Sequence, residues 1–249
     1  MAQFEQRVYK LLNLIEQRIA VVQGKGYGAE TVAQEVKRVL QVLNVAPRLA
    51  VDIGGNVGSY TAELRRTIPD LDIHVFEPSY TNVANLTKRF EGDQKIRIVP
   101  IALSDQTGTA TLYSNVPGSG FASLTKRKLD HFKIELDVKE AVETLRFEEY
   151  WLNQLGKAPI DIAKLDVEGH ELAVLNGFGC ALDQTRVIQF EFGGCNIDTR
   201  TFFQDFWYFF AERNFDIHRI TPFGLERIGR YRESDEFFST TNYIAVNRR

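Results

Sequence analysis

The feature that most constrains this chain is an apolar segment that runs into a glycine-rich turn between Leu49 and Thr61. Its first five residues, LAVDI, have the composition of a buried strand, and Gly54 and Gly58 follow closely. Glycines in such a turn let the backbone approach a ligand, and the helix that follows presents free amide N–H groups at its N-terminus. The segment therefore predicts an α/β protein with a ligand site at the carboxyl end of its first strand.

Short β-branched runs alternate with helical patterns from Arg48 onward, as in a parallel sheet with helices on both faces. A chain of 249 residues is long enough for one such domain with additions. We predict a mostly parallel, Rossmann-like sheet within residues 47–249, completed by an antiparallel C-terminal strand. The predicted strands are Leu49–Ile53, Asp72–Phe76, Ile96–Ile101, Ile160–Asp166 and Val187–Phe192, followed by Phe215–Ile220, Leu225–Ile228 and Tyr243–Val246.

Residues 1–46 are predicted to form a helical extension ahead of this domain. Apolar residues recur at steps of three and four between Phe4 and Val22, and again between Val32 and Leu43. The extension could cover the active site, contact another subunit of a homo-oligomer, or complete the core. We expect it to complete the core.

An interruption of the α/β pattern lies between Thr107 and Leu124. Alternating Thr and Tyr residues are followed there by the sequence Gly-Ser-Gly, which predicts a hairpin or flap with a mobile loop. We expect Ser119, Phe121 and Ser123 of this flap to close over a bound ligand.

A run of aromatic residues spans Phe202–Phe210. It is too mixed for one apolar stripe, so some of its rings should be exposed or covered by another element. We expect a helix that packs on the sheet; a contact with a hydrophobic acceptor or another subunit is the alternative.

Charge and cysteine usage narrow the classes of partner. The net charge of -3 disfavours nucleic acid, and the short basic run Lys126–Lys128 is expected to be a solvated face. The two cysteines lack metal-ligand spacing, which indicates a reducing, cytoplasmic setting. No run approaches the roughly 20 apolar residues of a transmembrane helix, so we expect no membrane span.

Three carboxylates end predicted strands at one edge of the sheet: Asp52, Glu77 and Asp166. The carboxyl ends of parallel strands meet at one crevice, where Glu77 would accept hydrogen bonds from ribose hydroxyls. Nicotinamide and S-adenosylmethionine sites both use such an acid. The spacing Gly54-x-Asn56-x-Gly58 differs from the GxGxxG that holds a pyrophosphate, which favours S-adenosylmethionine over a nicotinamide-dependent oxidoreductase. A non-catalytic cofactor-binding domain that recruits a partner is a further alternative.

Four segments together resemble the FkbM family of S-adenosylmethionine-dependent methyltransferases: VDIGGNVGSYT, VFEP followed by Asn82, IALSD, and KLDVEGHELAVLNG. The resemblance covers about residues 49–192 and implies O-methylation of a hydroxyl on a small molecule or glycan, such as a sugar or secondary metabolite. It also implies that the cofactor loop and the acid after the second strand contact the cofactor, with residues 102–104 near the adenine. The expected cofactor-binding residues are Asp52, Gly54, Asn56, Gly58, Ser59, Tyr60, Glu77, Pro78, Asn82, Ala102, Leu103, Ser104 and Asp166.

Methyl transfer to a hydroxyl also needs a group that removes the proton. His170 is the first candidate for this base, because its unperturbed pKa near 6.5 suits neutral pH. Glu168 and Asp166 are the competing candidates, but a carboxylate becomes a good base at neutral pH only when it is buried. We expect no metal; the alternative is a Mg²⁺ ion held by Asp166, Glu168 and Glu191 that would bind the acceptor oxygen.

Overall fold

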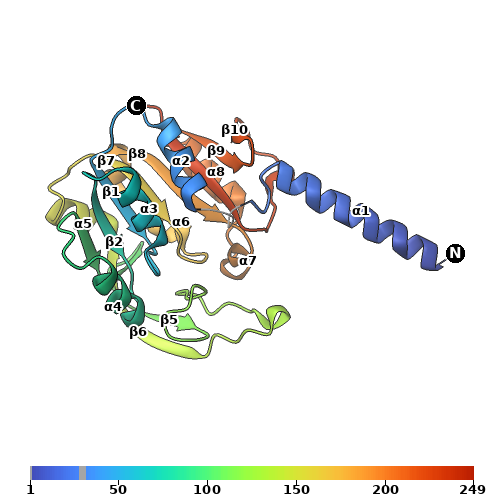
Figure 1. The fold of residues 1–249 in the computed structure, drawn as a ribbon, viewed down its shortest axis with the longest axis horizontal. Helices are drawn as coiled ribbons and strands as arrows, with labels where there is room; N and C mark the ends of the chain where they lie inside the picture. Colours follow the sequence, from blue (N-terminus) through green and yellow to red (C-terminus); the bar gives the residue numbers. More distant parts are fainter. Residues whose placement is uncertain (1, 28–31) are drawn as a thin grey trace.

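The computed structural model describes residues 2–27 and 32–249, and its centre is one large sheet (Figure 1). The strands are β1 (Leu49–Ile53), β2 (Asp72–Phe76), β3 (Ile96–Val99), β7 (Ile160–Leu165), β8 (Thr185–Phe192), β9 (Phe215–Thr221), β10 (Gly224–Arg227) and β11 (Thr241–Asn247). They form an eight-stranded sheet in the order β10-β9-β11-β8-β7-β1-β2-β3. The strands from β8 to β3 are parallel, and β11 runs antiparallel to both β8 and β9. The predicted Rossmann-like fold class is confirmed.

Helices cover both faces of this sheet and divide its core in two. One face packs against α2 (Val32–Val42), α3 (Ser59–Thr67) and α4 (Tyr80–Arg89). The other packs against α5 (Phe147–Asn153), α6 (Glu171–Gly177) and α8 (Phe203–Ala211). Successive residues of a strand point to opposite faces, so Val51 and Ile53 belong to the α6 side and Ala50 to the α3 side. Asp52 therefore points toward α3.

The aromatic run forms α8, as expected. Phe203, Phe206, Phe209 and Phe210 are buried, and the Phe206 ring stacks on Phe190 of β8 with centroids 5.1 Å apart. Phe202 and Tyr208 remain about half exposed, which explains why the run shows no single apolar stripe.

The prediction that residues 107–124 form a hairpin by themselves is wrong, because the strand that pairs with the first half of this segment lies further along the chain. A second sheet contains β4 (Ala102–Ser104), β5 (Gly108–Ser114) and β6 (Val138–Arg146), and β5 pairs antiparallel with β6. The Gly/Ser loop lies between β5 and β6 in the sequence. It pairs with β5 only through one isolated antiparallel bridge, between Tyr113 and Ser123. The sequence of β6 contains no apolar run, because exposed residues that include Lys139 and Glu143 alternate with buried or half-buried ones. The predicted strand Ile96–Ile101 also ends early, because Pro100 has no N–H to donate to a neighbouring strand.

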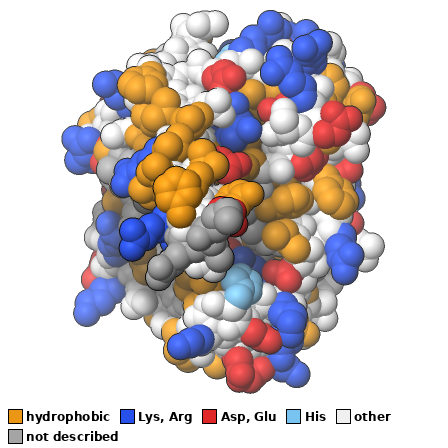
Figure 2. Space-filling view, turned by 90° about the vertical axis from the view of Figure 1, so that its right-hand side faces the viewer, with side chains coloured by type: hydrophobic (Ala, Val, Ile, Leu, Met, Phe, Trp, Pro, Cys, Tyr) orange, Lys and Arg blue, Asp and Glu red, His pale blue; other side chains and the backbone are white. Residues whose placement is uncertain are grey.

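The two N-terminal helices differ in their packing. Helix α2 completes the core as expected, with Val36 and Val39 fully buried. The expectation is wrong for α1 (Ala2–Val22), which extends away from the body (Figure 1) and leaves Phe4 71% and Leu11 58% exposed. Figure 2 looks at the molecule from this end and shows hydrophobic side chains gathered on it. Among the described helices, none is long and apolar enough to cross a membrane.

Candidate active site

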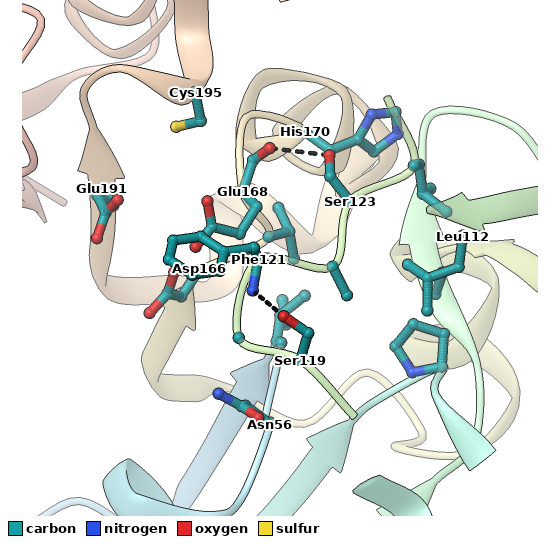
Figure 3. Close-up of a pocket in the computed structure, with 18 of the residues that line it drawn as sticks. Asn56, Leu112, Ser119, Phe121, Ser123, Asp166, Glu168, His170, Glu191 and Cys195 are labelled. Carbon is teal, nitrogen blue, oxygen red and sulfur yellow. Dashed lines mark hydrogen bonds between the residues drawn. The ribbon is translucent and has the colours of Figure 1, made fainter. Parts of the chain in front are cut away.

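A cavity of about 610 Å³ lies at the carboxyl ends of β1, β2, β7 and β8 (Figure 3). Residues Ser119–Leu124 of the Gly/Ser loop line it together with residues 238–240 from the C-terminal part of the chain. The loop after β5 thus borders the cavity where the predicted flap was expected to meet a ligand.

The turn after β1 is held against the end of β7. The Gly54 and Gly55 amides both donate to the Phe76 carbonyl, at 2.9 and 3.0 Å, and the Asp166 amide donates to the Ile53 carbonyl at 3.0 Å. Gly54 has φ +85°, and an added Cβ would lie 1.8 Å from the Asp166 carbonyl oxygen. Only glycine fits this position without separating the two strand ends.

Glu77 forms the centre of a polar cradle beside this turn. Its Oε2 accepts the Asn56 N–H at 2.8 Å and its Oε1 accepts the Ser79 N–H at 2.9 Å. Burial raises the pKa of Glu77 despite these two hydrogen bonds, which lower it. Asn82 donates to the Asn56 side chain at 3.2 Å, and its own Oδ1 is buried without a partner among the described residues. Each carboxylate oxygen of Glu77 retains a lone pair that can accept a ligand hydroxyl.

Most of the predicted cofactor residues line the cavity: Gly54, Asn56, Glu77, Pro78, Asn82, Ala102, Leu103 and Asp166. Ser104 contacts His170 instead, and the other four lie away from the cavity lining. Asp52 accepts the Thr61 hydroxyl at 2.5 Å, and Tyr60 donates to Gln189 at 2.9 Å on the α3 side of the sheet. Gly58 packs on α4, where an added Cβ would lie 2.7 Å from Leu86, and Ser59 is exposed.

Lys164 links the buried acids beneath the cavity. Its Nζ donates to Asp166 Oδ2 at 2.8 Å, and it stands opposite Asp52 in the pairing of β7 with β1. Burial opposes the ammonium charge, but the carboxylates of Asp166, Glu35 and Asp52 outweigh it and raise the pKa of Lys164. The ammonium group of Lys164 is therefore the counter-ion of the Asp166 carboxylate.

Glu168 lies in the cavity next to Asp166 (Figure 3). Its φ of +53° is unusual for a residue other than glycine and is typical of functional sites. Burial, followed by the charge of Asp166, raises the pKa of Glu168 to about 7, although its ion pair with Arg127 acts in the opposite direction.

Arg127 corrects the interpretation of the basic run as a solvated face. Its side chain is only 8% exposed and also approaches Asp198 at 3.6 Å. Lys126 and Lys128 are exposed as expected. One buried arginine between two exposed lysines gives no signal in the sequence.

His170 lies apart from the carboxylates in Figure 3, on the side of Leu112. Its Nε2 is 3.0 Å from the Ser104 hydroxyl, which in turn is 3.1 Å from Asp105 Oδ1. Burial lowers the pKa of His170. The ring is therefore neutral at pH 7 and is already hydrogen-bonded at the β4 end of the cavity.

Glu191 of β8 completes an acidic wall with Asp166 and Glu168. Burial, together with the charges of these two neighbours, raises the pKa of Glu191. Within residues 2–27 and 32–249, no three His, Cys, Asp or Glu side chains are arranged to hold a metal ion. Carboxylates this close favour retention of a proton by at least one of them.

Residues 52–217 match the Methyltransferase FkbM domain. The chain belongs to this methyltransferase family. The match confirms the resemblance and favours methyl transfer over the nicotinamide alternative. The FkbM domain of this chain contributes the β1 turn, Glu77, Asn82 and the segment Asp166–His170.

Individual relatives of this FkbM chain are distant. It is 27% identical over 165 residues to the 2-O-methyltransferase NoeI of Sinorhizobium fredii, covering 63% of this chain and 68% of that protein. It is 29% identical over 154 residues to methyltransferase sdnD of Sordaria araneosa, covering 51% and 59%. The solved FkbM methyltransferase of Methylobacillus flagellatus aligns with 92% of this chain and 59% of its own, at 15% identity and a TM-score of 0.47.

Proposed function

We propose that this protein transfers the methyl group of S-adenosylmethionine to a hydroxyl oxygen of a small molecule or glycan. The observation that carries the proposal is the cradle of Glu77, Asn56 and Asn82, joined in one cavity to the acidic wall around Glu168. When bound, the cofactor supplies an electrophilic methyl group on a sulfonium. The chain must hold the cofactor, orient the acceptor and take up a proton.

The residues of the cradle fit this cofactor. Glu77 can accept two ribose hydroxyls, and the unpartnered Oδ1 of Asn82 offers a further acceptor. The apolar side chains of Ala102 and Leu103 would border the adenine, and Asp166 would face the amino group of the methionine portion. Lys164 Nζ donates to Asp166 Oδ2 at 2.8 Å and holds this carboxylate in place.

Glu168 is the base that we propose for the acceptor proton. With a pKa of about 7, it is the group whose proton affinity best matches a reaction at neutral pH. Asp166 is neutralised by Lys164 at 2.8 Å, and His170 is engaged by Ser104 at 3.0 Å. Arg127 orients the Glu168 carboxylate and moderates its pKa.

A hydroxylated small molecule or glycan is the acceptor class that fits the acidic wall, since carboxylates accept hydrogen bonds from hydroxyls. An oxygen acceptor is also supported by the similarity to NoeI, which is a 2-O-methyltransferase. We propose no nucleic-acid acceptor, because the net charge is -3. Both cysteines are free, which agrees with the reducing, cytoplasmic setting that we propose.

Calorimetric titration with S-adenosylhomocysteine tests the cofactor. We expect micromolar binding by the wild type and at least about tenfold weaker binding by Glu77→Gln, since a charge-assisted acceptor for the ribose is lost. The amide oxygen keeps one of the two backbone hydrogen bonds and the amide NH2 faces the other N–H, so a melting curve of the variant checks that the loop stays folded. Glu140→Gln is the matched control, because Glu140 accepts the Tyr80 N–H at 2.7 Å outside the cavity.

Absence of heat with folded wild-type protein would contradict the proposal. Equal affinities for wild type and Glu77→Gln would remove Glu77 from the cofactor site. Repeating the titrations and an acceptor screen with Mg²⁺ and with a chelator tests the alternative in which Asp166, Glu168 and Glu191 hold the ion. We expect the same affinity and turnover under both conditions.

We also propose that α1 pairs with α1 of a second copy of this chain. At 3.6 residues per turn, six exposed apolar residues lie within about 50° of one line along the helix. Acidic residues flank this stripe on one side and basic residues on the other, so two helices packed stripe to stripe in parallel place opposite charges together. An antiparallel pair would place like charges together. The stripe is Phe4, Val8, Leu11, Leu12, Ile15 and Ile19, flanked by Glu5 and Glu16 and by Arg7 and Arg18.

Light scattering after size-exclusion chromatography tests this pairing. We expect the wild type to have twice the mass of one chain and Leu12→Glu to be monomeric, because the substitution buries a charge in the stripe. Asn13→Glu introduces the same charge on the opposite face of α1 and should remain dimeric. A monomeric wild type at micromolar concentration, or equal dissociation of both variants, would remove α1 as the interface.

A further inference from the structure

A second cavity, of about 520 Å³, is distinct from the methyl-transfer cavity, and the loop 228–240 contributes residues to the lining of both. It is formed by the segment after α1, the hairpin of β9 and β10, and the first half of that loop. Among the described residues that line it, cations predominate and the only carboxylates are those of Glu226 and Asp235. The cationic lining residues are Lys25, Arg219, Arg227, Arg230 and Arg232.

Arg219 of β9 is the residue that points to a ligand. It is 4% exposed, and its Nη2 donates to Glu226 at 2.7 Å. Its Nε and Nη1 are buried and have no hydrogen-bond partner among the described residues. Asp235 and the Tyr243 hydroxyl face the same guanidinium, and the Tyr243 oxygen is close enough to interact with it as a hydrogen-bond acceptor. The charge of Arg219 and this contact lower the pKa of Tyr243, although burial raises that pKa overall. A buried donor without an acceptor is costly, and the oxygens of an oxyanion can accept hydrogen bonds from such guanidinium N–H groups.

The remaining cations are only partly neutralised. Arg227 pairs with Asp216 at 2.8 Å, and Lys25 donates to the Ser234 carbonyl at 3.1 Å. Arg230 and Arg232 are exposed, and no carboxylate of the described chain forms an ion pair with either. Like charges gathered around one hollow repel one another, and an anion between them would reverse the sign of that interaction.

We propose that this cavity binds an oxyanion, such as a phosphate, sulfate or carboxylate group. Arg219 holds it from the floor, and Arg230 and Arg232 close over it from the loop. The anion cavity is lined by residues 228–230, 232, 234 and 235 of this loop, and the methyl-transfer cavity by residues 238–240. The anion is therefore either a free ion or a charged group of the acceptor itself. The assignment of the anion to the acceptor rests on the proposed function, whereas the anion site itself does not.

Titration with inorganic phosphate, at constant ionic strength with chloride as the reference, tests the site without any methyl donor. We expect wild-type binding with a Kd of about 1 mM or tighter and a matching rise in melting temperature. Arg219→Met removes the buried donors but could impair folding. The double variant Arg230→Gln/Arg232→Gln changes only exposed residues and should weaken phosphate binding at least about tenfold.

The control variant Lys88→Gln/Arg200→Gln removes two exposed charges elsewhere and should bind phosphate as the wild type does. Equal weakening by both double variants, or a wild type that responds to phosphate no more than to chloride, overturns the proposal.

A further arm identifies the source of the anion. If phosphate competes with the acceptor, and Arg230→Gln/Arg232→Gln raises KM with kcat unchanged, the group belongs to the acceptor. If phosphate binds without competing, it is a free ion; both outcomes support the site. Loss of S-adenosylhomocysteine binding would overturn the methyltransferase function and leave the phosphate titration unaffected, so the two failures are distinguishable.

Discussion

Gly54→Ala is expected to destabilise the protein by several kcal/mol and to abolish S-adenosylhomocysteine binding, whereas Gly92→Ala should cost about 1 kcal/mol. The two glycines have almost the same φ, +85° and +81°, so alanine meets an unfavourable left-handed φ at each. They differ in their surroundings. An added Cβ at Gly54 would lie 1.8 Å from the Asp166 carbonyl oxygen, and at Gly92 it would meet nothing within 4 Å.

Thermal unfolding of the two variants separates the cost of the positive φ from the cost of the clash with Asp166. A loss of 1 kcal/mol lowers the melting temperature by about 2–4 °C in a protein of this size, so Gly92→Ala should fall in that range. Gly54→Ala should lose about 10 °C or more, or fail to accumulate in soluble form. Equal melting temperatures for the two variants would mean that β1 and β7 separate at little cost, contrary to the close contact between their ends.

Glu168→Gln is expected to lower kcat by about 10²–10⁴-fold while S-adenosylhomocysteine affinity stays within about twofold of the wild type. The amide is close in shape to the carboxylate but accepts no proton. Because burial and Asp166 raise the Glu168 pKa to about 7, its base form is the minority below that pH and the majority above it. The wild-type rate should fall about tenfold per pH unit below pH 7 and level off above it.

The pH profile distinguishes Glu168 from its rivals. The pKa of His170 is lowered by burial from its ordinary 6.5, so a reaction through this ring would lose rate only at a lower pH than a reaction through Glu168. His170→Asn removes the imidazole and should leave both kcat and the inflection near pH 7 largely unchanged. Retention of that inflection in Glu168→Gln, or its disappearance in His170→Asn, would transfer the role to His170. The readout is S-adenosylhomocysteine release with an acceptor from the screen.

Local sequence was sufficient for the parallel half of the sheet and for the cofactor edge. β1 and β2 have the predicted bounds, because each is a short apolar run closed by turn residues. Glu77 could be placed at the cavity because a residue that ends a parallel strand must lie at the carboxyl edge. Gly54 follows from the same rule.

For neighbouring residues of the same motif, the direction in which each side chain points decided whether the residue reaches the cavity. Asp52 lies at the same carboxyl end of β1 as Gly54, but its side chain faces α3 and accepts a hydrogen bond from the Thr61 hydroxyl. Tyr60 lies in the predicted loop, but its hydroxyl donates to Gln189 of β8 on the α3 face of the sheet. Strand alternation and helix phase decide these directions, and a motif read as a string of letters does not contain them.

The sequence by itself determined the fold class, the family and the edge at which the cofactor should bind, because these depend on short-range periodicity and on turns that only certain residues can make. Tertiary structure decided which acid we propose as the base, since the pKa of Glu168 depends on burial and on Asp166 and Arg127. It also decided that α1 stands free and that cations from distant segments surround one cavity. Such properties depend on which residues become neighbours, and long-range contacts leave no local pattern in a single sequence.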